Sequence, residues 1–300
     1  MRAGLALPRK AISPKWLYDA RGGALYELIC EQPEYYPPRT EAAILARNAE
    51  EIARAIGPDA LVFEYGAGIA RKTVRLLATL RRPAAYVPVD ISRESLRTAG
   101  EAVSARFPRL PVHPVVADFT APVRLPLDGM PCARRVAFFP GSTIGNFDPP
   151  EAIALLGRMA RDAGPGGGLL VGVDAPKDAP TLVRAYDDAR GITAAFDLNL
   201  LTRMNRELAG DFRLAAFEHR SIWDPDRSRV EMHLVSRQSQ VVSVAGATFG
   251  FAAGETIHTE SAYKWTPSAF DALALAAGWR IERTWTDDRA WFAVKLYRVA

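Results

Sequence analysis

The chain has 300 residues, of which 49% are hydrophobic and 24% are charged, and its formal net charge is +4. These values are ordinary for a soluble globular protein of one large or two modest domains. The basic residues are scattered instead of forming a stripe with aromatic residues, which argues against a nucleic-acid-binding protein.

The two cysteines, Cys30 and Cys132, match no metal-binding or disulfide spacing. We therefore expect two idle thiols in a reducing cytoplasm and no bound metal. The apolar run near the start is broken by Pro8 and Arg9, which is too short for a signal peptide. No run approaches the roughly 18 apolar residues of a membrane helix. The composition thus predicts a cytoplasmic protein that contacts no membrane, and we expect a monomer.

The first 39 residues predict a cap instead of a part of an alternating core. A helix is expected to begin at Ser13, because a cap residue followed by proline is a typical helix start. A second helix is expected over 24–30 and a long third helix over 40–56. An aromatic- and proline-rich loop at 33–40 separates the last two.

From Leu61 onwards, short apolar strands alternate with helices. Strands are expected over 61–64, 85–89, 112–116, 135–139 and 166–174, with helices over 73–80, 92–106 and 150–160. Such alternation predicts an α/β fold, in which helices cover both faces of a doubly wound, mostly parallel sheet.

The alternation stops after Asp174. The segments that follow predict an α+β insertion, with helices over 180–193 and 196–208 and strands over 212–219, 229–237 and 240–244. A helix over 267–277 and two antiparallel strands, 279–286 and 291–299, then end the chain. This ending resembles that of class I methyltransferases. We expect a core domain of residues 40–176 and 264–300, and a second domain of residues 1–39 and 177–263.

Acidic residues and glycines gather at three consecutive strand ends. These residues are Glu64, Gly66 and Gly68 after the first strand, Asp90 after the second, and Asp118 with Phe119 after the third. Glycines let a flat ligand approach the backbone, and an acid at the second strand end can accept hydrogen bonds from ribose hydroxyls. The next Asp and Phe suit an adenine amino group and ring. An acid at a single strand end is more often a helix cap or a solvated loop charge. Because no phosphate-binding glycine loop is present, the combination favours S-adenosylmethionine over a dinucleotide.

Three further segments carry side chains suited to a small acceptor substrate. The loop over 138–147 follows the fourth strand, and its Asn146 could hold a substrate or cap the next helix. Glu260 could bind an amine or imidazole, or pair with Lys264. Tyr18, Tyr35, Tyr36 and Tyr186 could hold a carboxylate and a cation, or pack the cap against the core.

Four separated segments, over 13–19, 33–37, 139–147 and 257–260, resemble the histidine Nα-methyltransferases of ergothioneine biosynthesis. The resemblance covers nearly the whole chain. It implies a class I methyltransferase core with a substrate-binding domain. It also implies transfer of three methyl groups from S-adenosylmethionine to the α-amino group of L-histidine, which gives hercynine.

The resemblance assigns roles by motif position. The implied cofactor contacts are Tyr18, Gly66, Lys72, Asp90, Asp118 and Phe119, and the strand-end pattern adds Glu64 and Gly68 to them. The implied contacts of the histidine backbone are Tyr35, Asn146 and Tyr186, and those of its side chain are Gly141, Met232 and Glu260. We expect Tyr18 and Tyr35 to be catalytic, because the amine must lose a proton before each transfer. A tyrosine hydroxyl or an ordered water could accept that proton.

The sequence departs from the family pattern at Ala262, where the family typically has the serine of Glu-x-Ser. Ser261 is one residue away and would point to the opposite face of a strand. Losing one hydrogen bond to an imidazole weakens binding by about 0.5–1.5 kcal/mol, which is compatible with histidine. Two alternatives therefore stand beside histidine methylation. One is an N-methyltransferase that makes a betaine of another amino acid, and the other is a non-catalytic regulator that binds S-adenosylmethionine.

Overall fold

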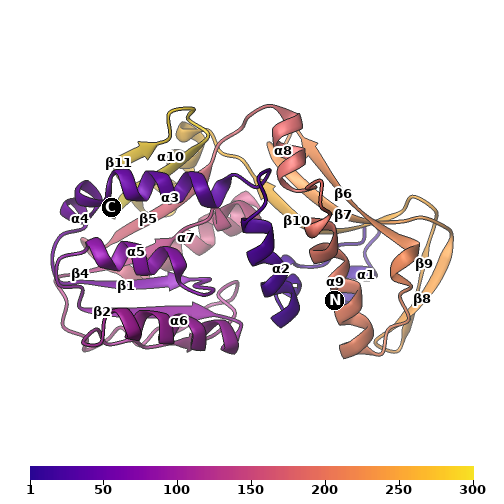
Figure 1. The fold of residues 1–300 in the computed structure, drawn as a ribbon, viewed down its shortest axis with the longest axis horizontal. Coiled ribbons are helices and arrows are strands. Elements are labelled where there is room, and N and C mark those ends of the chain that lie inside the picture. The colour runs from indigo at the N-terminus through magenta and orange to yellow at the C-terminus, as the bar shows by residue number, and fades with distance from the viewer. The chain divides into compact units, whose positions relative to one another are not determined.

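A computed structural model describes all 300 residues, and the chain divides into two compact units (Figure 1). Unit 1 comprises Met1–Tyr36 and Lys177–Tyr263, and unit 2 comprises Pro37–Pro176 and Lys264–Ala300. No helix is both long and apolar enough to span a lipid bilayer.

Unit 2 is built on a seven-stranded sheet with the strand order β11-β12-β5-β4-β1-β2-β3. Its strands are β1 (Ala60–Tyr65), β2 (Ala85–Asp90), β3 (Val115–Val116), β4 (Arg134–Phe139), β5 (Gly168–Asp174), β11 (Trp279–Thr286) and β12 (Phe292–Val299). The first five run parallel, and β12 pairs antiparallel with both β5 and β11. The predicted α/β class and the closing antiparallel hairpin are confirmed.

Helices cover both faces of this sheet. Successive side chains of β1 point to opposite faces, so this apolar strand contributes residues to the core on each side. The helices are α3 (Pro37–Arg47), α4 (Ala49–Ile56), α5 (Arg71–Thr79), α6 (Arg93–Arg106), α7 (Pro149–Ala163) and α10 (Pro267–Ala276). Phe63 packs in one core with residues of α7 and α10, such as Leu155 and Phe270. Val62 packs in the other core with residues of α3 to α6, such as Ile44 and Leu76.

Two predicted elements of unit 2 were wrong in extent. The single helix expected over 40–56 is two helices, interrupted at Asn48, whose side-chain amide donates to the carbonyl of Ile44. The strand expected over 112–116 is reduced to β3 and an isolated bridge between Tyr86 and Val112. Pro114 lies between these two pairings and has no N–H to donate to a neighbouring strand.

Unit 1 packs helices against a three-stranded antiparallel sheet with the order β10-β7-β6, and β8 and β9 form a separate hairpin. Its helices are α1 (Arg2–Leu5), α2 (Ala20–Cys30), α8 (Ala179–Ala185) and α9 (Ile192–Leu208), with short 3-10 turns at Pro14–Leu17 and Leu214–Ala216. Its strands are β6 (Phe217–Asp224), β7 (Arg229–Ser236), β8 (Gln240–Val244), β9 (Ala247–Phe251) and β10 (Thr256–Tyr263).

Several expectations for unit 1 need correction. The helix expected over 180–193 is wrong, because α8 ends at Ala185 and α9 begins at Ile192. The Asp188 carboxylate accepts hydrogen bonds from the backbone N–H groups of Ile192 and Thr193, and so starts the second helix. The strand expected over 212–219 begins only at Phe217, and β9 and β10 were not predicted as strands.

Candidate active site

The glycine turn after β1 has the backbone geometry that the sequence predicts. Gly66 and Gly68 have φ angles of +73° and +51°, in the left-handed region that favours glycine. A Cβ atom on Gly66 would lie 3.4 Å from the ring of Phe119. The missing side chain therefore keeps the backbone open beside that ring. The Phe119 ring itself packs 5.6 Å from the ring of Tyr65, measured between centroids.

Asp90, at the end of β2, links this turn to the start of α6. One carboxylate oxygen accepts from the N–H of Gly68 at 3.0 Å, and the other accepts from the N–H of Ser92 at 2.8 Å. Burial raises the pKa of Asp90, and the backbone hydrogen bonds oppose that rise. Each carboxylate oxygen can accept a further hydrogen bond, as from a ribose hydroxyl. Asp118 holds its own loop, because one of its oxygens accepts both the N–H and the hydroxyl of Thr120.

Glu64 is buried and bound by the chain's own hydroxyl groups. The hydroxyls of Thr73 and Tyr86 both donate to its Oε2 at 2.5 Å. Burial raises the pKa of Glu64 to about 8, although these hydrogen bonds and the charge of Lys72 act in the opposite direction. Glu64 is therefore mostly protonated at neutral pH, and its contact with a cofactor stays a prediction.

Glu41 is a buried carboxylate that the sequence analysis missed. It lies on α3, forms an ion pair with Lys72, and accepts the N–H of Gly141 with both oxygens at 2.9 Å. The carboxylate of Glu41 packs against Gly172 of β5, where a Cβ would lie only 1.9 Å from Glu41 Oε1. Glu41 thus joins a predicted cofactor contact to a predicted substrate contact. It shares the buried face of α3 with Ile44, and a glutamate within such an apolar stripe is the sequence signal.

Asn146 does not cap the helix that follows it, so that alternative is wrong. It ends a 3-10 turn, Thr143–Asn146, and α7 instead begins after Asp148. The N–H of Asp148 donates to the carboxylate of Glu151, which is the capping-box contact. The amide of Asn146 is half-buried, and its contact with a substrate stays a prediction.

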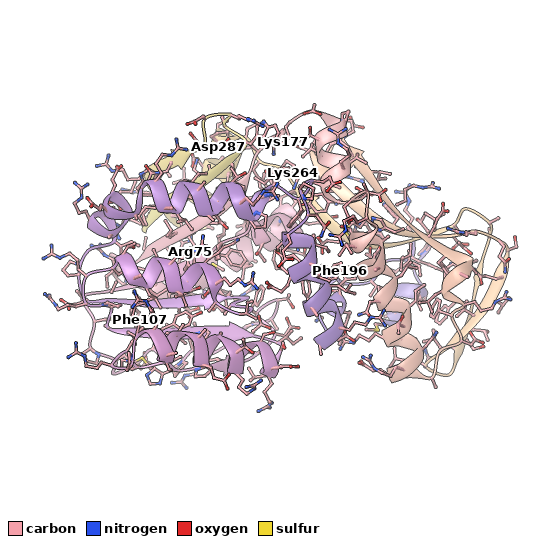
Figure 2. All side chains as sticks on the ribbon, in the orientation of Figure 1. Arg75, Phe107, Lys177, Phe196, Lys264 and Asp287 are labelled. Carbon is pink, nitrogen blue, oxygen red and sulfur yellow. The ribbon has the colours of Figure 1, made fainter.

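In unit 1, three of the predicted tyrosines lie in one aromatic cluster. The ring of Tyr18 lies 5.4 Å from that of Phe196, and the ring of Tyr35 lies 5.8 Å from that of Tyr186, all between centroids. Tyr26 contacts Tyr18, Tyr35 and Phe196, and joins the two pairs. Tyr26 and Phe196, the latter on α9 (Figure 2), were not predicted from the sequence.

Tyr18 and Tyr35 keep their protons at neutral pH. Burial raises the pKa values of Tyr18 and Tyr35 well above the ordinary value, and the charge of Glu260 raises both further. A neutral phenol donates a hydrogen bond readily but is a weak base. The shift therefore argues against either tyrosine as the proton acceptor, and favours the other expectation, an ordered water.

Glu260 lies in a row of three side chains across the sheet of unit 1. Its register partner is Met232 on β7, whose partner on β6 is Ser221. Direct cross-strand partners point to the same face, and all three are buried. A bulge between His258 and Glu260 sets this register, and the Thr259 hydroxyl within it donates to the carbonyl of Met232 at 3.0 Å.

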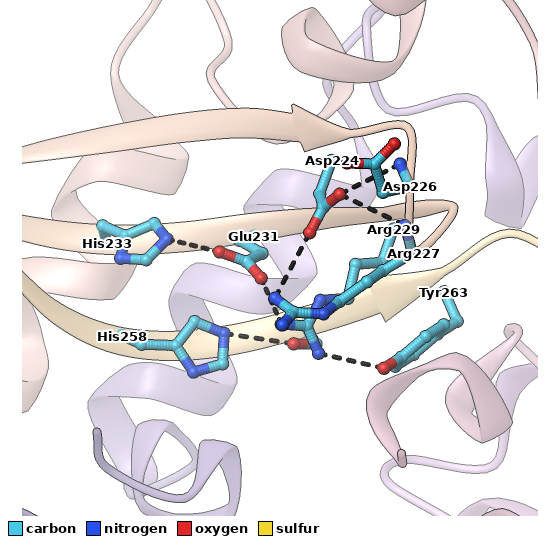
Figure 3. A network of polar contacts seen from close by, with 9 residues as sticks. Asp224, Asp226, Arg227, Arg229, Glu231, His233, His258 and Tyr263 are labelled. Atoms are coloured by element: carbon cyan, nitrogen blue, oxygen red, sulfur yellow. Dashed lines mark hydrogen bonds and ion pairs between the residues drawn. The ribbon is translucent and has the colours of Figure 1, made fainter. Parts of the chain in front are cut away.

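The opposite face of the same strands carries a polar network (Figure 3). Glu231 pairs with Arg229 and accepts from His233 Nε2 at 2.9 Å. Ser261 is the register partner of Glu231, and its hydroxyl lies 3.1 Å from Nε2 of His258. The expectation that Ser261 points away from the face of Glu260 is confirmed. Its hydroxyl therefore does not replace the one missing at Ala262.

His219 forms a buried ion pair with Asp197 and a hydrogen bond with the backbone of Tyr186. Its Nδ1 lies 2.8 Å from a carboxylate oxygen of Asp197, and its Nε2 lies 2.8 Å from the carbonyl of Tyr186. Both neighbours are acceptors, so both nitrogens must carry a proton. Burial lowers the pKa of His219, but the hydrogen bond and charge of Asp197 outweigh it and leave the pKa raised. Neither His219 nor Asp197 was predicted from the sequence.

The fold and the strand-end residues of unit 2 define a class I S-adenosylmethionine-dependent methyltransferase. The fold is similar to the structure of the CcbJ methyltransferase from Streptomyces caelestis, with a TM-score of 0.50 and 18% identity, over 86% of this chain and 96% of that one. Residues 1–299 match the family described as histidine-specific, SAM-dependent methyltransferases, and the chain belongs to that family.

Two relatives carry the same description in their names. The chain is 43% identical to a histidine N-alpha-methyltransferase of Mycolicibacterium smegmatis, over 99% of this chain and 92% of the relative. It is 39% identical to the histidine N-alpha-methyltransferase of Mycobacterium tuberculosis, over 98% of this chain and 92% of the relative. The chain is therefore an enzyme of this class, and its substrate is an amino acid and not a macromolecule.

Proposed function

We propose that this enzyme transfers three methyl groups in succession from S-adenosylmethionine to the α-amino group of L-histidine, and so produces hercynine for ergothioneine biosynthesis. The observation that carries the proposal is Glu260, a buried carboxylate whose charge acts on Tyr18 and Tyr35. An imidazole N–H needs such an acceptor, and a quaternary ammonium product is attracted by aromatic faces and by negative charge.

Unit 2 carries the residues that would hold the cofactor, and they fit an adenosyl group. The carboxylate of Asp90 can accept further hydrogen bonds from ribose hydroxyls. Gly66 has no Cβ, which leaves space at the turn, and the ring of Phe119 lies beside that space. When bound, S-adenosylmethionine supplies an electrophilic methyl group on a sulfonium. The contacts of Tyr18, Glu64, Gly68, Lys72 and Asp118 with the cofactor are part of the same proposal.

Unit 1 carries most of the residues that would hold the amino acid. The hydroxyls of Tyr35 and Tyr186 can donate hydrogen bonds to the substrate carboxylate. Glu260 would accept the imidazole N–H, and Met232 would pack beneath the ring. The substrate contacts of Gly141 and Asn146 stay predictions. With the phenols neutral, the α-amino group would release its proton to water before each transfer.

A second candidate is the formation of a betaine from another amino acid. The observation that favours it is Ala262, which is buried on the face of Glu260 and has no hydroxyl to offer an imidazole. The third alternative, a non-catalytic regulator, finds no support in a chain that belongs to an enzyme family along its whole length.

Incubation of the purified protein with S-adenosylmethionine and L-histidine, followed by mass spectrometry, tests the proposal. We expect histidine carrying one, two and then three methyl groups, with the trimethylated product accumulating. A matched variant, Glu260→Gln, should raise the KM for histidine and leave cofactor affinity unchanged. The absence of any methylated histidine, from protein that binds the cofactor, would overturn the proposal.

A further inference from the structure

The row formed by Ser221, Met232 and Glu260 contains a buried hydroxyl that makes no hydrogen bond within the chain. Ser221 is 6% exposed, and its Oγ has no hydrogen-bond partner within the chain. A buried polar group left without a partner costs about 1–3 kcal/mol. Such groups are rare in folded proteins, and each calls for an explanation. Because Ser221 shares a face with the proposed imidazole acceptor, a ligand is a direct explanation.

We propose that Ser221 is a specificity-determining residue, whose hydroxyl binds the second ring nitrogen of the substrate while Glu260 binds the first. This inference rests on the proposed function, since it requires an imidazole as the substrate side chain. A neutral imidazole has one N–H donor and one acceptor nitrogen. A carboxylate and a hydroxyl, one on each side of the ring, satisfy both and select one tautomer.

The strand register separates Ser221 from Glu260 by a distance that suits an imidazole ring. Neighbouring strands lie about 4.7–4.9 Å apart, so the Cα atoms of Ser221 and Glu260 are separated by roughly 10 Å, with Met232 between them. Two hydrogen bonds of about 2.8 Å and the width of an imidazole fill that span once both side chains lean inward. The Met232 thioether then lies beneath the ring, a favourable sulfur–aromatic contact.

The hydroxyls of β10 are not available for this purpose. Ser261 lies on the opposite face beside His258, and Thr259 donates to the carbonyl of Met232. Ala262 lies on the correct face but has no hydroxyl. Ser221 thus supplies from β6 the polar contact that β10 lacks, which removes the main reason to favour a substrate without an imidazole.

Ser221→Ala tests the proposal through histidine affinity and stability. We expect the dissociation constant for histidine, measured by calorimetry, to rise about 2- to 12-fold, as does KM, with cofactor affinity unchanged. The free energy of unfolding should stay the same or increase, because a hydroxyl without a partner is removed. A purely structural serine would instead lower stability and leave the histidine dissociation constant unchanged. Ser243→Ala, on an exposed position of β8, is the matched control.

The double variant Ser221→Ala/Ala262→Ser provides a second, independent test. A hydroxyl returned to the same face should restore histidine affinity in the Ser221→Ala background. In the native background, the same Ala262→Ser change should add less, because the ring nitrogen is already satisfied. Wild-type histidine affinity in Ser221→Ala, or equal effects of Ala262→Ser in both backgrounds, would overturn the role of Ser221. If the native protein methylates no histidine at all, the proposed function itself fails, which is a separate outcome.

Discussion

The buried pair of His219 and Asp197 gives a prediction whose size follows from the structure. Their side chains are 1% and 0% exposed, and the imidazolium bonds to Asp197 on one side and to the carbonyl of Tyr186 on the other. In Asp197→Asn the counter-charge is lost. The ring must then either stay charged without a counter-charge or lose a proton and exchange its charge-assisted hydrogen bond for a weaker, neutral one.

The expected cost is that of one hydrogen bond to a charged group, about 1.5–3 kcal/mol in the free energy of unfolding. The pH dependence has a definite sign. The pKa of His219 is raised in the folded chain, so its contribution is complete below the unfolded value of about 6.5 and is lost as pH rises through the folded pKa. The stability difference between native protein and variant should therefore be largest at acid pH and shrink at alkaline pH.

Urea unfolding of both proteins between pH 6 and pH 9 measures this difference. Asp187→Asn is the control, because Asp187 is exposed and acts on His219 only through its charge at a distance. We expect that control to stay within about 0.5 kcal/mol of the native protein. The KM for histidine should also rise in Asp197→Asn, since a neutral ring donates a weaker hydrogen bond to the backbone carbonyl of Tyr186. A variant as stable as the native protein at every pH would refute a charged His219.

Three further predictions concern unit 2. Asp90→Ala should weaken S-adenosylmethionine binding in calorimetry and leave the circular dichroism spectrum intact, and an unchanged dissociation constant would refute the ribose contact. Gly172→Ala places a Cβ at 1.9 Å from Glu41 Oε1, so we expect a loss of about 1–3 kcal/mol in urea unfolding, and native stability would contradict the packing. Glu64 keeps its proton up to about pH 8 when folded but loses it near 4.5 when unfolded, so rising pH favours unfolding across this window, by at most about 5 kcal/mol. Glu64→Gln should remove that decline, and an unchanged pH profile would contradict a protonated Glu64.

The parallel core could be predicted because each of its elements is encoded locally. The strands β1, β2, β4 and β5 are short apolar runs, and the residues at their ends follow directly in the sequence. Ser92 starts α6 as predicted, since its hydroxyl accepts from the N–H of Ser95. The predicted bounds were wrong where a single residue interrupted a local pattern. Proline removed a donor from the third strand, and Asn48 divided a helix that periodicity alone would continue.

The missed residues act through contacts between distant parts of the sequence. Glu41 and Gly141 are 100 positions apart, and neither one alone signals the other. His219 and Asp197 required the placement of β6, which the sequence analysis began five residues too early. Ser221 became informative only when the register aligned it with Met232 and Glu260. Tyr18, Tyr35 and Tyr186, by contrast, were candidates because of their side-chain chemistry, and the family resemblance gave each of them a separate role.

A competition experiment tests whether L-histidine is the methyl acceptor. The native protein is incubated with methyl-labelled S-adenosylmethionine and an equimolar mixture of the common amino acids, and the labelled products are identified by mass spectrometry. We predict that the label appears in histidine alone, predominantly as the trimethylated α-amino product. Label in a different amino acid, with histidine unmodified, would contradict the account.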